Sequence, residues 1–175
     1  ERLVKITGEA FFDVVHNNEK PFIVITGDLA IQDIGTSFNI NAKVSDSTEV
    51  IVKTGEVTIS LPASNPVHVF QNERSVYHKQ EKRIIKTPDN DVNALAYKTK
   101  IFVFENASLP AVFQTLNEVY ETHIQISDSL KYCHLTATFK NEKIETVLQI
   151  ITETLQLQVK DSGSQTILEG AGCEK

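Results

Sequence analysis

The sequence predicts an α+β protein in which an all-β domain is followed by a smaller domain built from two β-α-β units. Three observations lead to this fold class. The first half consists of short runs that alternate apolar with polar residues, the apolar period becomes that of a helix after a polar break at 87–91, and the second half repeats itself after 35 residues. We therefore expect domains at 1–88 and 101–170, a linker at 89–100 and a tail at 171–175.

Ten runs in the first half are expected to be strands, because each is rich in β-branched or aromatic residues and ends near Gly, Asn, Asp, Ser or Pro. The runs are 2–6, 10–15, 22–26, 29–34, 37–44, 49–54, 56–61, 67–70, 75–79 and 83–87. Many short strands at this spacing predict a sandwich, a jelly roll or a β-solenoid-like fold. Thr54-Gly55-Glu56 is expected to form a hairpin tip, and residues 17–21 a longer loop.

Two helices are expected in the second half, because apolar residues recur there at helical spacing. The first set is Leu109, Val112, Phe113, Leu116, Val119 and Tyr120, and the second is Ile144, Val147, Leu148, Ile151 and Leu155. Asn106 or Ser108 is expected to cap the first helix and Asn141 the second, since short polar side chains accept hydrogen bonds from the N–H groups of a first turn.

The two helices belong to an internal repeat. The stretch FENASLPAVFQTLNEVY at 104–120 aligns with FKNEKIETVLQIITETL at 139–155, and HIQISD at 123–128 aligns with QLQVKD at 156–161. Each copy is a strand, a helix and a strand, and residues 165–169 are expected to add a last strand. A lone β-α-β unit cannot cover its own apolar faces, so we expect the two copies to pack as one domain.

Composition and charge exclude several classes of function. The 175 residues carry a net charge of −6 without a dense run of Lys and Arg, which argues against nucleic-acid binding. No apolar run approaches the roughly 18 residues that a membrane-spanning helix needs, and no signal peptide is recognisable. The chain contains no Met, even at position 1. We therefore expect it to begin inside a longer gene product that could include a membrane anchor.

Side chains that could perform catalysis do not form a recognisable motif. The five His residues show no HxH or HExxH spacing, and the adjacent Cys133 and His134 point to opposite faces of a strand. Gly35-Thr36-Ser37 does not fit a nucleophile motif and is expected to be a turn that enters a strand. There is no glycine-rich phosphate-binding loop. We therefore expect no catalytic residue, no metal and no cofactor, and we do not expect an enzyme.

The two cysteines, Cys133 and Cys173, lie 40 residues apart. Two cysteines do not by themselves identify a disulfide, although an oxidising compartment would permit one. The simpler expectation is two unpaired thiols, with Cys173 in a mobile tail.

A protein without catalytic motifs but with many strands most often works by contact, because a sheet edge offers unpaired N–H and C=O groups to a partner strand. The stretches LTATFK at 135–140 and SQTILE at 164–169 alternate apolar with small polar residues, so either is a candidate edge. The alternative is that both are interior strands. The candidate partner-binding residues are Thr136, Thr138, Gln165, Thr166 and Ile167.

Several blocks of the sequence resemble the signature of FecR-type anti-sigma regulators. They are GEAFFDV at 8–14, PFIVIT at 21–26, IGTSFNI at 34–40 and the pair EV and TGEV at 49–57. The FEN and FKN starts of the two repeats resemble the C-terminal domain that accompanies this signature in members from Bacteroidetes. The chain has Gln71-Asn72-Glu73 where the family often has a Pro-Gly-Glu turn, and residues 96–100 where it tends to have Trp and a glycine-containing turn.

The resemblance implies a protein of the inner membrane with a cytoplasmic sigma-factor-binding segment, one membrane helix and a periplasmic region, of which this chain would be the last. It implies that the periplasmic region binds the signalling domain of an outer-membrane TonB-dependent transporter. The sigma factor and the membrane would be contacted only through segments outside this chain. The repeat domain resembles the short N-terminal fold of secretins and TonB-dependent transporters.

Two other functions remain open at this point. One is a carbohydrate-binding or glycan-processing β-domain with an accessory α+β module, which a concave pocket with clustered aromatics or paired carboxylates would favour. The other is a purely structural protein of the cell envelope.

Overall fold

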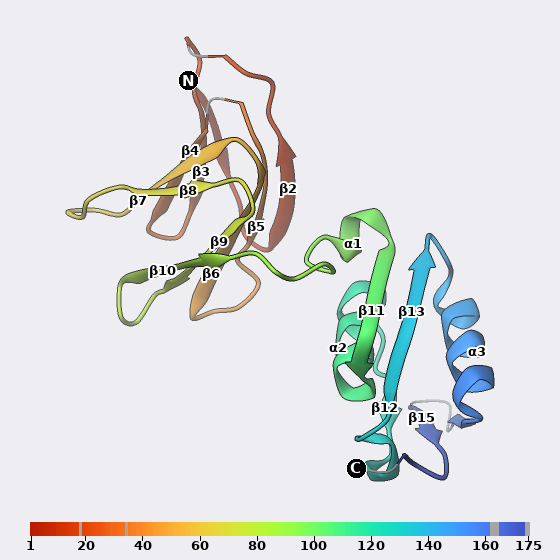
Figure 1. The fold of residues 1–175 in the computed structure, drawn as a ribbon. Helices are drawn as coiled ribbons and strands as arrows, with labels where there is room; N and C mark the ends of the chain where they lie inside the picture. Colours follow the sequence, from red (N-terminus) through yellow and green to blue (C-terminus); the bar gives the residue numbers. More distant parts are fainter. Residues whose placement is uncertain (18, 34, 162–164, 174–175) are drawn as a thin grey trace. The chain divides into compact units, whose positions relative to one another are not determined.

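The computed structural model describes residues 1–17, 19–33, 35–161 and 165–173. The chain divides into two compact units, Glu1–Asn90 and Asp91–Lys175. The first unit is made of strands, and the described helices all belong to the second (Figure 1). The α+β class and the all-β character of the first half are therefore confirmed.

The described residues of the first unit form a β-sandwich of ten strands. One sheet has the strand order β1-β3-β4-β7-β8 and the other the order β10-β9-β6-β5-β2. All ten predicted strands are present. Their bounds are β1 Arg2–Lys5, β2 Glu9–Asp13, β3 Phe22–Thr26, β4 Leu29–Asp33, β5 Ser37–Asn41, β6 Ser47–Thr54, β7 Glu56–Ser60, β8 Val67–Phe70, β9 Glu73–His78 and β10 Arg83–Pro88. Of the three β architectures considered, the sandwich is the one found.

The core of the sandwich is formed by alternate residues of both sheets, as the period of a strand requires. Val24 and Ile31 from one sheet and Phe38 and Val52 from the other are fully buried and belong to one cluster. Phe12 joins this core, and its ring lies 5.3 Å from that of Phe38 between centroids. The aromatic residues of the first sequence blocks therefore serve packing.

Thr54-Gly55-Glu56 is not the hairpin tip that the sequence suggested. β6 and β7 on either side of it belong to different sheets, so the chain crosses here from one layer of the sandwich to the other. β6 is already paired on both sides, by β5 and β9, and β7 pairs with β4 and β8 instead. Gly55 has a φ of +72°, a conformation that glycine adopts without strain.

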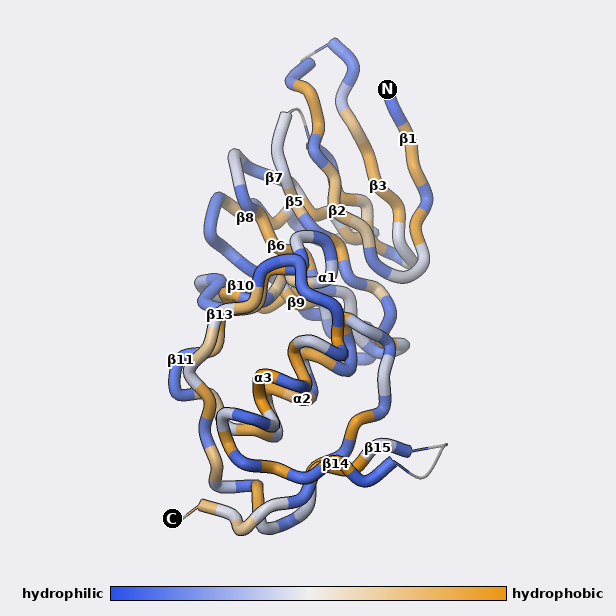
Figure 2. The backbone as a smooth tube through the Cα atoms, turned by 90° about the vertical axis from the view of Figure 1, so that its right-hand side faces the viewer, coloured by the Kyte–Doolittle hydropathy of each residue, from blue (hydrophilic) through white to orange (hydrophobic). Residues whose placement is uncertain are grey.

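The second unit has two narrow sheets with helices packed against both. β11 (Ile101–Ser108) and β13 (His134–Lys140) form an antiparallel pair, and the other sheet has the order β12-β15-β14. The remaining bounds are α1 Ala96–Thr99, α2 Leu109–Tyr120, β12 Gln125–Ile126, η1 Asp128–Leu130, α3 Ile144–Leu155, β14 Gln158–Asp161 and β15 Thr166–Glu169. One core contains buried residues of both helices and of both sheets, and Figure 2 shows α2 and α3 enclosed by the strands.

The predicted repeat is confirmed in three dimensions. The two long helices occupy 109–120 and 144–155, an offset of 35 residues, and each ends at a residue with a left-handed backbone, Glu121 and Gln156. Gln114 donates to Glu118 in the first copy as Gln149 donates to Glu153 in the second. The same sequence pattern has therefore produced the same local structure twice.

Of the predicted helix caps, Ser108 stands at the N-cap position, whereas Asn106 and Asn141 do not, and no predicted side-chain cap bond is formed. Ser108 precedes α2 and Lys143 precedes α3, and neither helix has a side-chain cap hydrogen bond. Asn106 and Asn141 instead have positive φ angles of 49° and 54°, respectively. Asn tolerates this left-handed conformation better than most residues, so the two asparagines of the repeat shape the entry to each helix through their backbones.

Residues 89–100, expected to be a linker, carry structure of their own. The short helix α1 lies in this stretch and packs against α2. Neither α1 nor η1 was predicted, because four and three residues are too few for a periodic pattern. Lys100 and Asn72, which stand where the family resemblance suggests glycine-containing turns, have positive φ angles of 53° and 62°.

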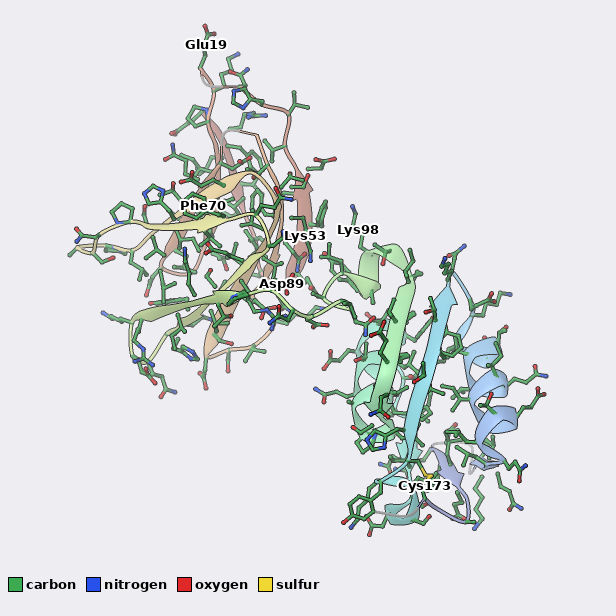
Figure 3. All side chains as sticks on the ribbon, in the orientation of Figure 1. Glu19, Lys53, Phe70, Asp89, Lys98 and Cys173 are labelled. Carbon is green, nitrogen blue, oxygen red and sulfur yellow. A yellow bond between two sulfur atoms is a disulfide. The ribbon has the colours of Figure 1, made fainter. Side chains whose placement is uncertain are left out.

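Cys133 and Cys173 form a disulfide, so the expectation of two unpaired thiols is wrong (Figure 3). The Cα atoms are 5.0 Å apart across a separation of 40 residues. Residues 170–173 return to η1, where Ser129 Oγ donates to the Gly170 carbonyl at 3.1 Å. Cys133 is buried in the core of the unit. The part of the expected tail at 174–175 lies outside the described residues.

We expect Cys173→Ser to lower the free energy of unfolding of the second unit by about 4 kcal/mol, because a cross-link over some 40 residues removes conformational entropy from the unfolded chain. Urea unfolding followed by the helical circular dichroism signal measures this, since the described helices belong to that unit. Dithiothreitol should cause the same loss in the wild type and none in the variant. Equal midpoints for the oxidised wild type and the variant would contradict the prediction.

Candidate functional site

The strand edges of the second unit are the first candidate, and β13 has an open edge. Val103 of β11 uses both its backbone N–H and its C=O to bond the Asn93 side chain, at 2.8 and 2.9 Å. Thr138 lies opposite Val103. Because Val103 points its backbone groups away from β13, the pair is not mutually hydrogen-bonded, and Thr138 points its own N–H and C=O to the other edge.

The outer edge of β13 offers four residues with the same orientation. By the two-residue period of a strand, His134, Thr136 and Lys140 follow Thr138 in pointing their backbone groups outward. All four side chains are exposed. Thr136 Oγ1 accepts a hydrogen bond from the Asn106 N–H at 2.9 Å, where β11 has a bulge. Among the described strands, none pairs with this edge, so Thr136 and Thr138 stand where the sequence placed a candidate edge.

Gln165, Thr166 and Ile167 do not stand at an edge, so the edge interpretation of 164–169 is wrong. β15 lies in the centre of its sheet, parallel to β12 on one side and antiparallel to β14 on the other. The strand is interior because two neighbours complete its ladder, which is the alternative that the sequence left open. Ser164 lies outside the described residues. A role of the other three in partner binding stays a prediction that would have to use side chains.

The edge strands of that sheet are β12 and β14, and the sequence singled out neither as an edge. The β14 residues Gln158–Asp161 are all exposed, and Val159 is 52% exposed. Lys160 forms an ion pair with Glu169 of β15 at 2.6 Å. The sequence could not identify β14 as an edge strand, because the alternating run LQLQV is equally typical of an interior strand.

A hollow of about 380 Å³ in the first unit is the second candidate. It lies where the chain crosses between the sheets, beside Gly55. Its lining residues are His16, Gln32, Asp33, Gly35, Thr36, Gly55, Glu56 and Thr58. The blocks IGTSFN and TGEV thus meet at one place, although they are some twenty residues apart in the sequence.

Asp33 organises this hollow. Its carboxylate accepts hydrogen bonds from the N–H groups of Gly35 at 2.9 Å and Thr36 at 3.3 Å, and from the Thr36 hydroxyl at 2.6 Å. Asp33 is 1% exposed. A Cβ atom on Gly55 would approach Thr36 Cγ2 to 2.6 Å, so glycine is needed here for space as well as for its positive φ. These hydrogen bonds hold the turn that follows β4, as in an Asx turn, so the Asp33 carboxylate serves the fold.

The chemistry available in the hollow is limited. Glu56 is hydrogen-bonded to His68 on the neighbouring strand β8, and no Phe, Tyr or Trp is among the described residues that line the hollow. Within the described chain, no group of three or more His, Cys, Asp or Glu side chains is placed to hold a metal ion. The clustered aromatics or free paired carboxylates that a glycan site would need are therefore not found in this hollow.

The pKa values of Glu73 and Tyr120 are shifted from their ordinary values by contacts within the fold. The Lys86 ammonium and the Phe70 N–H hold the pKa of Glu73 below its ordinary value, and they lie 2.7 and 2.8 Å from its carboxylate. Burial raises the pKa of Tyr120, whose hydroxyl donates to the Glu142 carbonyl at 2.7 Å. Each side chain bonds a neighbouring segment of its own unit, and neither is among the residues that line the hollow.

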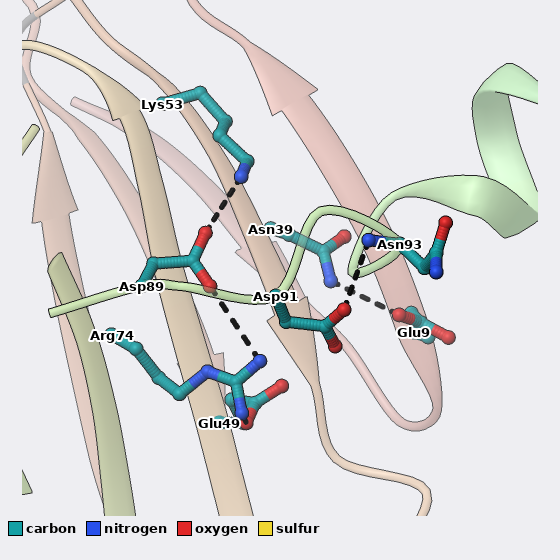
Figure 4. Close-up of polar contacts among 8 residues, drawn as sticks. All are labelled: Glu9, Asn39, Glu49, Lys53, Arg74, Asp89, Asp91 and Asn93. Atoms are coloured by element: carbon teal, nitrogen blue, oxygen red, sulfur yellow. Dashed lines mark hydrogen bonds and ion pairs between the residues drawn. The ribbon is translucent and has the colours of Figure 1, made fainter. Parts of the chain in front are cut away.

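The end of the first unit is held by a buried carboxylate. Asp89, whose side chain is 2% exposed, accepts from Lys53 Nζ at 2.7 Å and lies 3.6 Å from Arg74 Nη2 (Figure 4). Its N–H donates to the Asn72 carbonyl at 2.8 Å. The chain leaving the sandwich is thus fixed up to Asp89, immediately before the second unit begins.

Comparison with models of known protein families identifies the family of this chain. The model of the FecR protein family matches residues 1–58, and the model of the FecR C-terminal domain matches residues 101–168. The chain belongs to the FecR-type anti-sigma factor family. Membership supports a role in regulating a sigma factor, and the family acts by regulation rather than by catalysis.

Solved structures agree with the family assignment. A crystal structure from Parabacteroides distasonis, provisionally described as an anti-sigma factor, superposes with a TM-score of 0.64 at 25% identity, covering 95% of this chain and 79% of that one. A second crystal structure with the same description gives a TM-score of 0.64 at 24% identity, covering 96% and 80%. A search among curated proteins found no match. Among the described helices, none is long and apolar enough to cross a membrane.

We expect Asp33→Ala to lower the free energy of unfolding of the first unit by about 3 kcal/mol, because three donors lose a charged acceptor in a buried site. Gln32→Ala is the matched control: Gln32 is the exposed neighbour on the same strand, and its removal should change the free energy by less than about 0.5 kcal/mol. Amide hydrogen exchange of core residues in the first unit measures the free energy of unfolding of each variant. Equal losses in the two variants would show that Asp33 does not organise the turn.

Proposed function

We propose that this chain is the periplasmic sensor region of a transmembrane anti-sigma factor. In this role it binds the signalling domain of an outer-membrane TonB-dependent transporter and relays the signal to a cytoplasmic sigma factor. Family membership supports the regulatory part of the proposal. The disulfide supports the compartment, since such bonds persist in the oxidising periplasm and are rare in the cytosol. The sigma factor and the inner membrane would be reached through segments outside this chain.

The observation that carries the proposal is the open edge of β13. This edge presents outward-pointing backbone groups at Thr136 and Thr138, and a strand of the transporter domain would complete the ladder there. The exposed side chains along the edge include Lys140 and no carboxylate between 134 and 140. A partner strand with an acidic residue opposite Lys140 and β-branched residues opposite the threonines would fit this pattern.

Relay of the signal requires that binding favour one of two states of the protein. The sandwich is the part that the proposal assigns to transmission, and the repeat unit is the part that it assigns to recognition. Nothing in the described chain requires catalysis for this scheme. Binding alone can shift the population of an interaction-competent state, by as much as the difference in affinity of the partner for the two states.

Thr138→Pro tests the proposal, because proline removes one outward N–H without touching the ladder to β11. We expect the affinity for the signalling domain of the proposed transporter partner to fall roughly tenfold or more, as loss of about 1.4 kcal/mol would give. Isothermal titration measures it. Thr138→Val is the matched control, since it keeps the N–H and should bind as the wild type does.

Unchanged binding by a folded Thr138→Pro protein would exclude this edge. In that case, Thr166→Ala and Gln165→Ala would test side-chain recognition at β15, the other predicted location. Glycan-array binding without affinity for any transporter domain would instead favour the carbohydrate-binding alternative. No described feature of the hollow in the first unit favours that alternative, because its carboxylates are engaged and its described lining includes no Phe, Tyr or Trp.

A further inference from the structure

A two-stranded sheet has two outer edges, and in this unit they are not equivalent. β11 and β13 pair only with each other among the described strands. Each strand therefore has one side on which backbone groups lack a ladder partner. Such an edge can pair with any extended chain, including a second copy of the same protein, and proteins commonly protect edges that must not be used.

The edge of β11 is closed by a side chain. The Asn93 carboxamide accepts from the Val103 N–H at 2.8 Å and donates to the Val103 C=O at 2.9 Å. A primary amide presents the same acceptor and donor as a peptide group, so this pair of bonds reproduces one rung of a β-ladder. The centre of the β11 edge is thus filled from the same chain.

On either side of Val103, this edge has one further side-chain contact and one irregularity. Thr99 Oγ1 accepts a hydrogen bond from the Ile101 N–H at 3.2 Å, on one side of Val103. On the other side, the bulge in β11 turns the Asn106 N–H toward Thr136 of β13. A strand added to β11 would therefore meet an occupied centre and an irregular end.

Asn93 is held in position by its own backbone. Its N–H donates to Asp91 Oδ1 at 2.9 Å, and its carbonyl accepts from the Ala96 N–H at 2.8 Å, at the entrance to α1 (Figure 4). The side chain is half-buried. Because both backbone groups are engaged in a turn, the carboxamide needs little further ordering to bond Val103.

Within the described part of the chain, no side chain closes the opposite edge in the same way. Thr138 is the cross-strand neighbour of Val103, and its outward N–H and C=O have no partner among the residues that the structure describes. We infer that Asn93 is an edge cap that closes β11 against strand addition, so that this sheet accepts a partner strand on β13 alone. The identity of that partner rests on the proposed function, whereas closure of β11 does not.

The strand that Asn93 prevents from pairing with β11 is β11 of a second copy of this chain. Strand addition between two β11 edges would be antiparallel about a two-fold axis, which allows the same residues of both copies to pair. Removing the carboxamide would free the N–H and C=O of Val103 on both copies at once. We therefore expect Asn93→Ala to dimerise at concentrations at which the wild type is monomeric.

Amide exchange in the wild type tests the closure directly, with a control in the same protein. Val103 and Thr138 are opposite each other, and among the described residues a partner on the outward side is found for Val103 and not for Thr138. After correction for intrinsic rates, we expect the Val103 amide to exchange roughly tenfold more slowly than the Thr138 amide, as one hydrogen bond of ordinary strength would give. In Asn93→Ala below its dimerisation range, the two should exchange alike. Equal protection in the wild type would overturn the inference.

Light scattering across a concentration series tests the consequence for assembly. Asn93→Ala should form a dimer, and adding Val103→Pro should restore the monomer by removing the freed N–H. Asn93→Asp, which keeps the acceptor and loses the donor, should dimerise less than Asn93→Ala. A folded Asn93→Ala protein that stays monomeric throughout would overturn the inference, as would dimers that persist in the double variant.

Titration with the transporter signalling domain separates this inference from the proposed function. If both hold, Asn93→Ala monomers bind the domain with wild-type affinity, and Thr138→Pro weakens binding without causing dimers. If the domain does not bind the wild type, the proposed partner is wrong, while the exchange and scattering results still decide the role of Asn93. If Asn93→Ala weakens binding at concentrations where it is monomeric, β13 is not the sole edge in use and the inference fails.

Discussion

The second unit depends on one packing constraint: two helices must bury their apolar faces between two narrow sheets. Val112 and Leu116 of α2 and Val147 and Ile151 of α3 share a single core with both sheets. Within the described chain, one of these sheets has two strands and the other has three. Narrow sheets leave a large share of their backbone groups at edges, so edges that are closed and edges that are open become the main feature of the unit's surface.

A different constraint governs the first unit, where the chain must cross between two layers without leaving polar groups unpaired. Asp33 meets this requirement by accepting three hydrogen bonds at the entry to β5. Gly55 lies where the chain crosses from β6 to β7, and because it has no Cβ atom, Thr36 can lie close to it. Two of the sequence blocks that identify the family, IGTSFN and TGEV, coincide with this corner, and their place there is explained by folding rather than by reactivity.

The disulfide joins the C-terminal end of the second unit to the middle of that unit's chain. Cys133 lies directly before β13, and its carbonyl accepts from the N–H of Leu109 at the start of α2. Linking it to Cys173 holds residues 170–173 against η1. The start of the edge strand on which the proposed recognition depends is therefore fixed covalently as well as by packing.

The sequence by itself determined the strands of the first unit, the two long helices and the repeat. These features depend on local period and turn chemistry, and residues close in the chain determine them. It also placed Thr136 and Thr138 on a strand that has an open edge. The resemblance of its sequence blocks gave the family.

Only the tertiary structure decided which strands are neighbours. Strand order depends on pairings between distant residues, which the period of a single strand does not encode. For this reason Thr54-Gly55-Glu56 is a crossing rather than a hairpin, and β15 is central rather than an edge. The closure of β11 by Asn93 and the bond between Cys133 and Cys173 have the same origin, since each joins groups that meet only after the chain has folded.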